Sequence, residues 1–160
     1  MTGRPKLRSI VLDATDARAL AEFYRQLLGF GYRPGDEPPP AGAPDPAGAD
    51  WLVLVDPSTD AQLAFQQVDE LPPSTWPAPD VPQQLHLDLS VADVDALHTQ
   101  RDRALALGAT IRLDRSDDPD EPLYALADPT GHPFCIFVVP EPGPTASTNR
   151  SMARSDSPRT

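Results

Sequence analysis

Polar and apolar residues follow the same pattern twice along the chain. Each copy begins with a short run in which apolar and polar residues alternate, at 7–14 and at 85–90, and this alternation predicts a half-buried strand. An aspartate then precedes a stretch with apolar residues at helical spacing, which a glycine ends. Asp16 and Asp93 are offset by 77 residues, and Gly29 and Gly108 by 79. Two copies of this length indicate a duplicated half-domain, because a solenoid needs three or more shorter repeats.

Three further strands follow each predicted helix. We expect them at 30–33, 51–55, 62–68, 110–113, 123–127 and 133–139. Residues 34–50 are rich in Pro, Gly, Ala and Asp and predict a mobile loop, and 71–82 predict a proline-rich linker.

The sequence therefore predicts an α+β fold of two βαβββ units, at about 7–68 and 85–139. Together they would form one domain over 1–140. Residues 141–160 are rich in Ser, Pro, Arg and Thr without periodicity, and we expect them to form a disordered tail.

Charge and cysteine content limit the classes of partner. The net charge of -11 argues against nucleic acid and anionic membranes, which need a cationic surface. The single cysteine, Cys135, excludes an internal disulfide framework and a zinc knuckle. The chain starts without an apolar leader, and no run approaches the length of a membrane span. We therefore expect a cytoplasmic protein that binds neither nucleic acid nor a membrane.

Two short motifs add a family resemblance. Phe-Tyr-x-x-Leu-Leu-Gly-Phe at 23–30 and Asp-Pro-x-Gly-x-Pro-Phe at 128–134, in this order of elements, resemble the vicinal oxygen chelate superfamily of glyoxalases, bleomycin-resistance proteins and extradiol dioxygenases. The chain is most similar to the glyoxalase-like domain proteins of high-GC bacteria. The resemblance implies paired, curved mixed sheets around a cup-shaped cavity that holds a small-molecule ligand. Members of the superfamily often dimerise, so a homodimer is one possible state of this chain.

The resemblance also implies where a metal ion would bind. Metal-dependent members use one ligand on the first and one on the last strand of each half, usually His or Gln and then Glu. Here these positions fall at Ser9, Gln66 (or Phe65, if the preceding turn differs by one residue), His86 and Cys135. Serine is a poor ligand, and Cys135 replaces the carboxylate that a hard divalent ion prefers. We expect no metal ion and no other cofactor; a divalent ion, if bound, would use His86 and Gln66.

Polar residues on the first strand of each half are the main site candidates. His86 and Asp88 share a face by the period of two, and Asp13 occupies the matching face of the first half. His86 is the candidate base or ligand contact, and Asp88 would orient the imidazole or bind a cationic group. The alternative is that these groups make only structural hydrogen bonds.

Gln66, Trp51 and Cys135 complete the predicted ligand pocket. We place Gln66 rather than Phe65 inside the cup, and Trp51 would stack on a planar ligand. Cys135 is either a small buried hydrophobe or a thiol activated by His86. Two histidines, His98 and His132, are expected to be structural or exposed, and Trp76 to be a packing anchor.

These candidates lead to two expectations about function. The first is metal-independent binding of a small cationic or planar molecule in the cup between the halves. The alternative is an enzyme of this superfamily, a lyase, isomerase or dioxygenase, that uses His86 as base or metal ligand.

Overall fold

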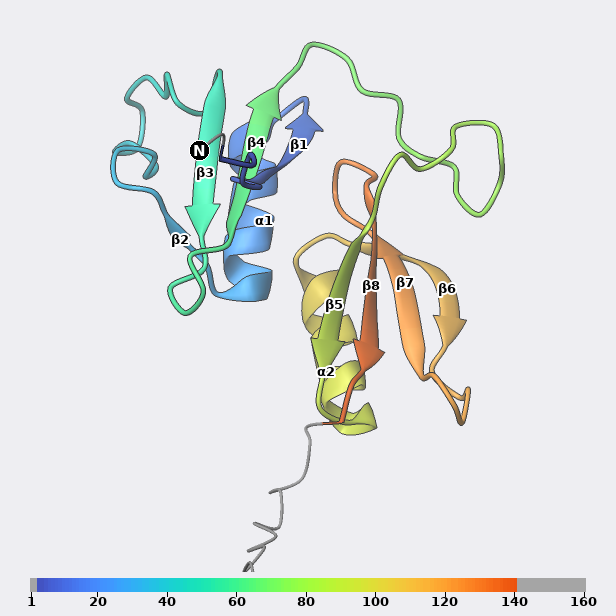
Figure 1. Ribbon diagram of the computed structural model, residues 1–160. Helices are drawn as coiled ribbons and strands as arrows, with labels where there is room; N and C mark the ends of the chain where they lie inside the picture. Colours follow the sequence, from blue (N-terminus) through green and yellow to red (C-terminus); the bar gives the residue numbers. More distant parts are fainter. Residues whose placement is uncertain (1–2, 141–160) are drawn as a thin grey trace, which may run out of the picture.

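The computed structural model describes residues 3–140 and contains both predicted βαβββ units (Figure 1). The first unit consists of β1 (Ile10–Ala14), α1 (Ala17–Leu28), β2 (Gly31–Tyr32), β3 (Trp51–Val55) and β4 (Gln62–Gln67). The second consists of β5 (Leu87–Val91), α2 (Val94–Ala106), β6 (Thr110–Arg115), β7 (Leu123–Ala127) and β8 (Pro133–Val138). The predicted tail at 141–160 lies outside the described residues. Among residues 3–140, no helix has the length and apolar character needed to cross a membrane.

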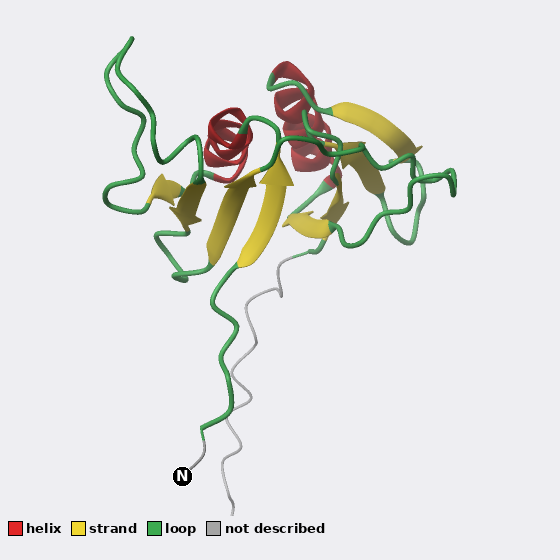
Figure 2. Ribbon diagram, turned by 90° about the horizontal axis from the view of Figure 1, so that it is seen from above, coloured by secondary structure: helices red, strands yellow, loops and turns green. Residues whose placement is uncertain are grey.

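Each unit forms its own four-stranded mixed sheet. The strand orders are β1-β4-β3-β2 and β5-β8-β7-β6, with β1–β4 and β5–β8 parallel and the other pairs antiparallel. Both helices cover the same side of the sheets, which leaves the opposite faces free of helices (Figure 2). The expected α+β fold of two mixed sheets is confirmed, and the sheets do not close into a barrel.

The predicted aspartates cap both helices. The carboxylate of Asp16 accepts a hydrogen bond from Ala19 N at 2.9 Å, and that of Asp93 accepts one from Ala96 N at 2.7 Å. Each bond satisfies a backbone N–H that has no partner within its helix. At the end of α1, Gly29 adopts the left-handed conformation (φ 75°) that stops the helix.

One hydrophobic core joins the two units. Phe23 and Tyr24 of α1 pack against Phe134 of β8 with ring centroids 6.1 and 6.4 Å apart, and Tyr24 also packs on Phe65 of β4 at 5.8 Å. Tyr24, Phe65 and Phe134 are fully buried. Because α1 thus contacts the sheet of the other unit, neither half has a core of its own.

The loop at 34–50 is irregular, as its composition predicts, but it is held to the fold. The guanidinium of Arg18 donates to both carboxylate oxygens of Asp45, at 2.7 and 2.8 Å, and to Asp36 O at 2.7 Å. This pairing lowers the pKa of Asp45 to about 2. The buried carboxylate of Asp36 accepts from Val53 N at 2.9 Å, so the loop is attached to both α1 and β3.

The linker packs directly on the turn before β8. Gly131 in that turn has a φ of 105°, and a Cβ placed on it would lie 2.5 Å from Pro73 Cβ. Glycine is required here for two reasons, because L side chains rarely adopt this backbone conformation and because Pro73 occupies the space.

We predict that Gly131→Ala lowers the free energy of unfolding by about 1–3 kcal/mol, from backbone strain and the contact with Pro73. Urea denaturation measures this loss. Gly31→Ala is the control, because an added Cβ there meets nothing within 4 Å and the φ of Gly31 is not positive. Similar stability of the two variants would contradict the close packing of the linker on the turn.

Candidate functional site

A cavity of about 220 Å³ lies between the two halves, where the linker passes over them. Its walls come from β1, from two stretches of the linker (71–74 and 81–85) and from the turn at 130–133. The lining is mostly Val, Leu and Pro side chains. Asp13 and His132 are its two ionisable residues.

Asp128, next to this cavity, is a buried carboxylate with hydrogen bonds to both oxygens. Its Oδ1 accepts from the backbone N–H groups of Thr130, Gly131 and His132 at 2.9, 2.8 and 3.0 Å. Its Oδ2 accepts from the Tyr24 hydroxyl at 3.0 Å and lies 3.0 Å from His132 Nδ1. The residue is only 4% exposed, so these bonds replace the water that the carboxylate loses on folding. Asp128 therefore fixes the turn, the imidazole and α1 relative to one another.

Tyr24 is held in the donor role in this contact. Burial, followed by the charge of Asp128, raises the pKa of Tyr24 well above its usual value. The phenol consequently keeps its proton and donates to Asp128.

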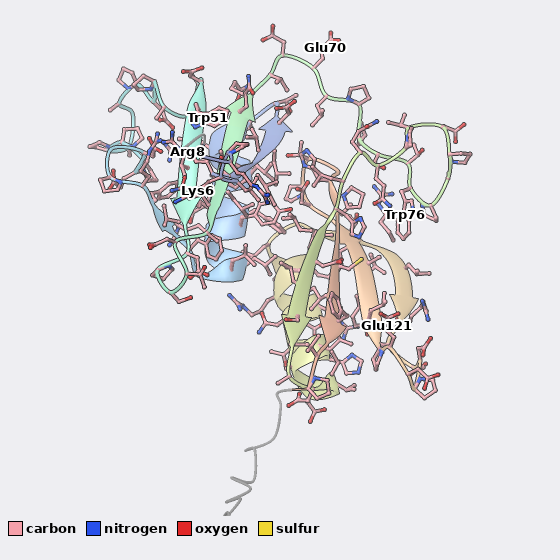
Figure 3. The ribbon with its side chains drawn as sticks, viewed as in Figure 1. Lys6, Arg8, Trp51, Glu70, Trp76 and Glu121 are labelled. Carbon is pink, nitrogen blue, oxygen red and sulfur yellow. The ribbon has the colours of Figure 1, made fainter. Side chains whose placement is uncertain are left out.

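The predicted site residues of the first half lie next to one another on β1, β3 and β4. Gln66 is the cross-strand neighbour of both Asp13 and Trp51. Gln66 is exposed while Phe65 is fully buried, so the register is the one expected, with Gln66 on the face away from the helix. Trp51 lies on β3, whereas Trp76 lies in the linker beside the other half, so the two indoles do not form one wall (Figure 3).

The predicted residues of the second half form a separate group. His86 Nε2 lies 3.4 Å from Asp88 Oδ1, and Asp88 is the cross-strand neighbour of Cys135. One side-chain ligand atom from each of the three lies within 4.8 Å of the others. The side chains of His86 and Asp88 are 42% and 58% exposed, so this group faces solvent.

Cys135 does not have the environment of an activated thiol. Burial, followed by the negative charges of Asp88 and Glu121, raises the pKa of the thiol above its usual value. A nucleophilic cysteine needs a lowered pKa. In the metal-free protein the thiol is therefore protonated at neutral pH, and the hydrophobe alternative describes it better.

The donor set of this group fits zinc. Imidazole, carboxylate and thiolate are all common zinc ligands, and three of them leave the fourth position free. The distance of 3.4 Å between His86 Nε2 and Asp88 Oδ1 suits neighbouring ligands of a tetrahedral ion, and the Cys135 thiol lies within 4.8 Å of both ligand atoms. Asp88 takes part here in place of Gln66, which lies on the other sheet.

The structure thus separates the six predicted pocket residues. Asp13, Trp51 and Gln66 lie on one sheet, whereas Asp88 and Cys135 lie on the other and His86 directly precedes its strand β5. The prediction that His86 lies within a strand at 85–90 is therefore wrong, because β5 begins at Leu87. Of the six, only Asp13 lines the cavity between the halves. His132, expected to be structural or exposed, lines that cavity as well. The sequence signal that could have indicated this role is that His132 lies four residues after Asp128 of an Asp-Pro turn, because such an aspartate accepts hydrogen bonds from the groups that follow it.

The comparisons with known proteins agree with the fold. Residues 9–137 match the family model described as a glyoxalase-like domain. The chain belongs to this family. The resemblance to the glyoxalase, bleomycin-resistance and dioxygenase group is therefore confirmed. The comparison with curated proteins found no match for this glyoxalase-like domain.

Several solved structures share the fold of this glyoxalase-like domain. A glyoxalase/bleomycin resistance protein/dioxygenase family enzyme from Burkholderia phytofirmans has a TM-score of 0.62 and 17% identity, covering 84% of this chain and 99% of that one. A glyoxalase/dioxygenase from Nostoc punctiforme has a TM-score of 0.58 and 21% identity, with coverages of 85% and 92%. A fosfomycin resistance protein from Mesorhizobium loti has a TM-score of 0.58 and 12% identity, with coverages of 86% and 94%.

We predict that Tyr24→Phe lowers the free energy of unfolding by about 1–3 kcal/mol, because a buried carboxylate loses a donor that no water replaces. Tyr32→Phe is the matched control. The Tyr32 hydroxyl donates to Glu22 at 3.1 Å, but Glu22 also accepts from Arg25 and Gln26 and is partly exposed. Thermal or urea unfolding of both variants measures the difference. An equal loss of stability would show that the hydrogen bond to Asp128 contributes no more to stability than the one to Glu22.

Proposed function

We propose that this glyoxalase-like domain binds a small molecule in the cavity between its halves, without a metal ion. The observation that carries the proposal is the cavity itself, which combines an apolar lining with the two ionisable residues Asp13 and His132. Binding sites for small molecules commonly have this composition. The volume of about 220 Å³ lies below the usual range of about 300–1,000 Å³ for drug-sized ligands, so the ligand is compact.

The descriptions of two structural neighbours name resistance proteins, but the ligand class of this chain is inferred from its cavity. One solved neighbour is described as a fosfomycin resistance protein, and another as a member of the bleomycin-resistance group. Their identities to this chain, 12% and 17%, establish only the shared fold. The ligand class is therefore our inference from the cavity.

We predict that benzyl alcohol, a compact neutral probe, shifts the amide resonances of cavity residues such as Val11 and Gln83 in ¹⁵N-labelled protein. Val11→Phe should abolish these shifts, because the half-exposed Val11 lines the cavity and a larger side chain there fills it without entering the core. EDTA should leave the shifts unchanged. Probe shifts that are scattered over the surface, or that disappear with EDTA, would count against this function.

A metal-dependent enzyme is the second candidate, and the group of His86, Asp88 and Cys135 favours it. These three side chains would hold the ion, and a bound zinc ion supplies a Lewis acid or an activated water. Without a metal ion, His86 would act as the base with Asp88 orienting its imidazole, as the pair lies 3.4 Å apart.

Metal content separates the first candidate from the metal-dependent form of the second. If the domain binds its ligand without a metal ion, protein purified without chelator should contain well under one equivalent of zinc, iron, nickel or manganese by elemental analysis. Stoichiometric zinc that is lost in His86→Ala and Asp88→Asn, and retained in the control His98→Gln, would establish the second candidate instead. His98 suits the control because its Nδ1 lies 3.0 Å from the Tyr124 hydroxyl, outside the group.

A further inference from the structure

Asp128 and His132 form a fixed carboxylate–imidazole pair at the wall of the cavity. The distance from His132 Nδ1 to Asp128 Oδ2 is 3.0 Å. The carboxylate is fully buried, while the imidazole is 22% exposed and lines the cavity. This side chain therefore connects the interior of the fold to the proposed ligand site.

The partners of Asp128 determine which ring nitrogen carries the proton. Three backbone N–H groups and the Tyr24 hydroxyl all donate to this carboxylate. A carboxyl group surrounded by donors is ionised and acts only as an acceptor. Nδ1 of His132 must then carry a hydrogen to bond Oδ2, so the neutral imidazole has its free electron pair on Nε2.

Nε2 of His132 is available to a ligand. Within residues 3–140, this nitrogen has no hydrogen-bond partner, although Nδ1 does. Asp13, which also lines the cavity, forms no ion pair within that part of the chain. The cavity thus offers two acceptors, an imidazole nitrogen and a carboxylate, in an otherwise apolar lining.

We infer that His132 Nε2 and the Asp13 carboxylate recognise the ligand, and that the ligand is a compact apolar molecule with a hydroxyl or ammonium group. Such a group donates to Nε2, and an ammonium also neutralises Asp13. A carboxylate of the same size has no proton to donate and meets the charge of Asp13. This inference rests on the proposed function, because it assigns the ligand chemistry of the same cavity.

Asp128 and Tyr24 are positioning residues in this arrangement. Asp128 sets the tautomer and the orientation of His132, and Tyr24 holds Asp128 from the other half of the molecule. Neither needs to touch the ligand, because both are fully buried.

The tautomer is tested first, by long-range ¹H–¹⁵N spectra of the imidazoles at a pH where all are neutral. The chain has three histidines, so the substitutions His86→Gln, His98→Gln and His132→Gln assign every signal. We expect His132 to carry its proton on Nδ1. A proton on Nε2 would overturn the inference, because the ring would then present a donor to the cavity.

Ligand chemistry is tested with three probes of matched size: benzylamine, benzyl alcohol and benzoate. From the cavity resonances, we expect both donors to bind at least about fivefold more tightly than benzoate, corresponding to one hydrogen bond. His132→Phe should weaken benzyl alcohol about three- to tenfold and His132→Gln less, because the glutamine keeps an acceptor. His98→Gln should leave all three affinities unchanged.

The outcomes separate the two proposals. If all three probes bind in the cavity with equal affinity and His132→Phe changes none of them, the inference fails while the proposed function stands. If no probe shifts the cavity resonances, the proposed function fails and the inference fails with it.

Discussion

The hydrogen bond from the Tyr24 hydroxyl to the Asp128 carboxylate lies where the two halves of the molecule meet. Burying a charge is costly unless its hydrogen bonds are made, and the Asp128 carboxylate accepts from a side chain of one half and from backbone N–H groups of the other. The need to satisfy the buried Asp128 carboxylate explains several features together. It closes the turn before β8, fixes the imidazole of His132 and joins α1 to the second sheet. The aromatic contacts of Tyr24 with Phe65 and Phe134 surround the same bond with apolar side chains, which keeps water away from it.

The two copies of the repeat have different roles in this arrangement. Buried positions are numerous in α1, whereas α2 buries only Leu97 and Ala104. At the offset of 77 residues, Arg101 stands where the first copy has Tyr24. Arg101 does not enter the core between the sheets; its guanidinium stacks on the Tyr124 ring, 4.9 Å from the centroid. The polar faces differ as well, with an amide, a carboxylate and an indole on the first sheet and potential metal ligands on the second. A single site that uses both sheets equally is therefore not the arrangement observed.

Local sequence patterns predicted the helices and strands. Contacts between residues that are distant in the sequence could not be predicted from these patterns. Alternation, helical spacing and the capping residues located the strands and helices because each signal lies within one turn or one strand. The position of Gln66 followed from the same alternation, since Phe65 had to face the core. The cavity was not predictable in this way, because the linker forms much of it and prolines carry no periodicity. The bond between Arg18 and Asp45 joins residues 27 apart, and His132 gains its role from a helix in the other half.

The two Asp-Pro turns show how duplicated segments become different. In the first copy, Asp56 bonds the exposed residues Ser58 and Thr59, and Asp60 adopts the left-handed conformation with a φ of 61° although it is not glycine. In the second copy, the linker packs against Gly131, and Asp128 accepts hydrogen bonds from both halves. The side-chain bonds of Asp56 thus join only residues of its own turn. In the second turn a smaller residue at position 73 would not make Gly131 replaceable, because its φ of 105° still disfavours L side chains, so this turn is expected to keep its glycine as the sequence diverges.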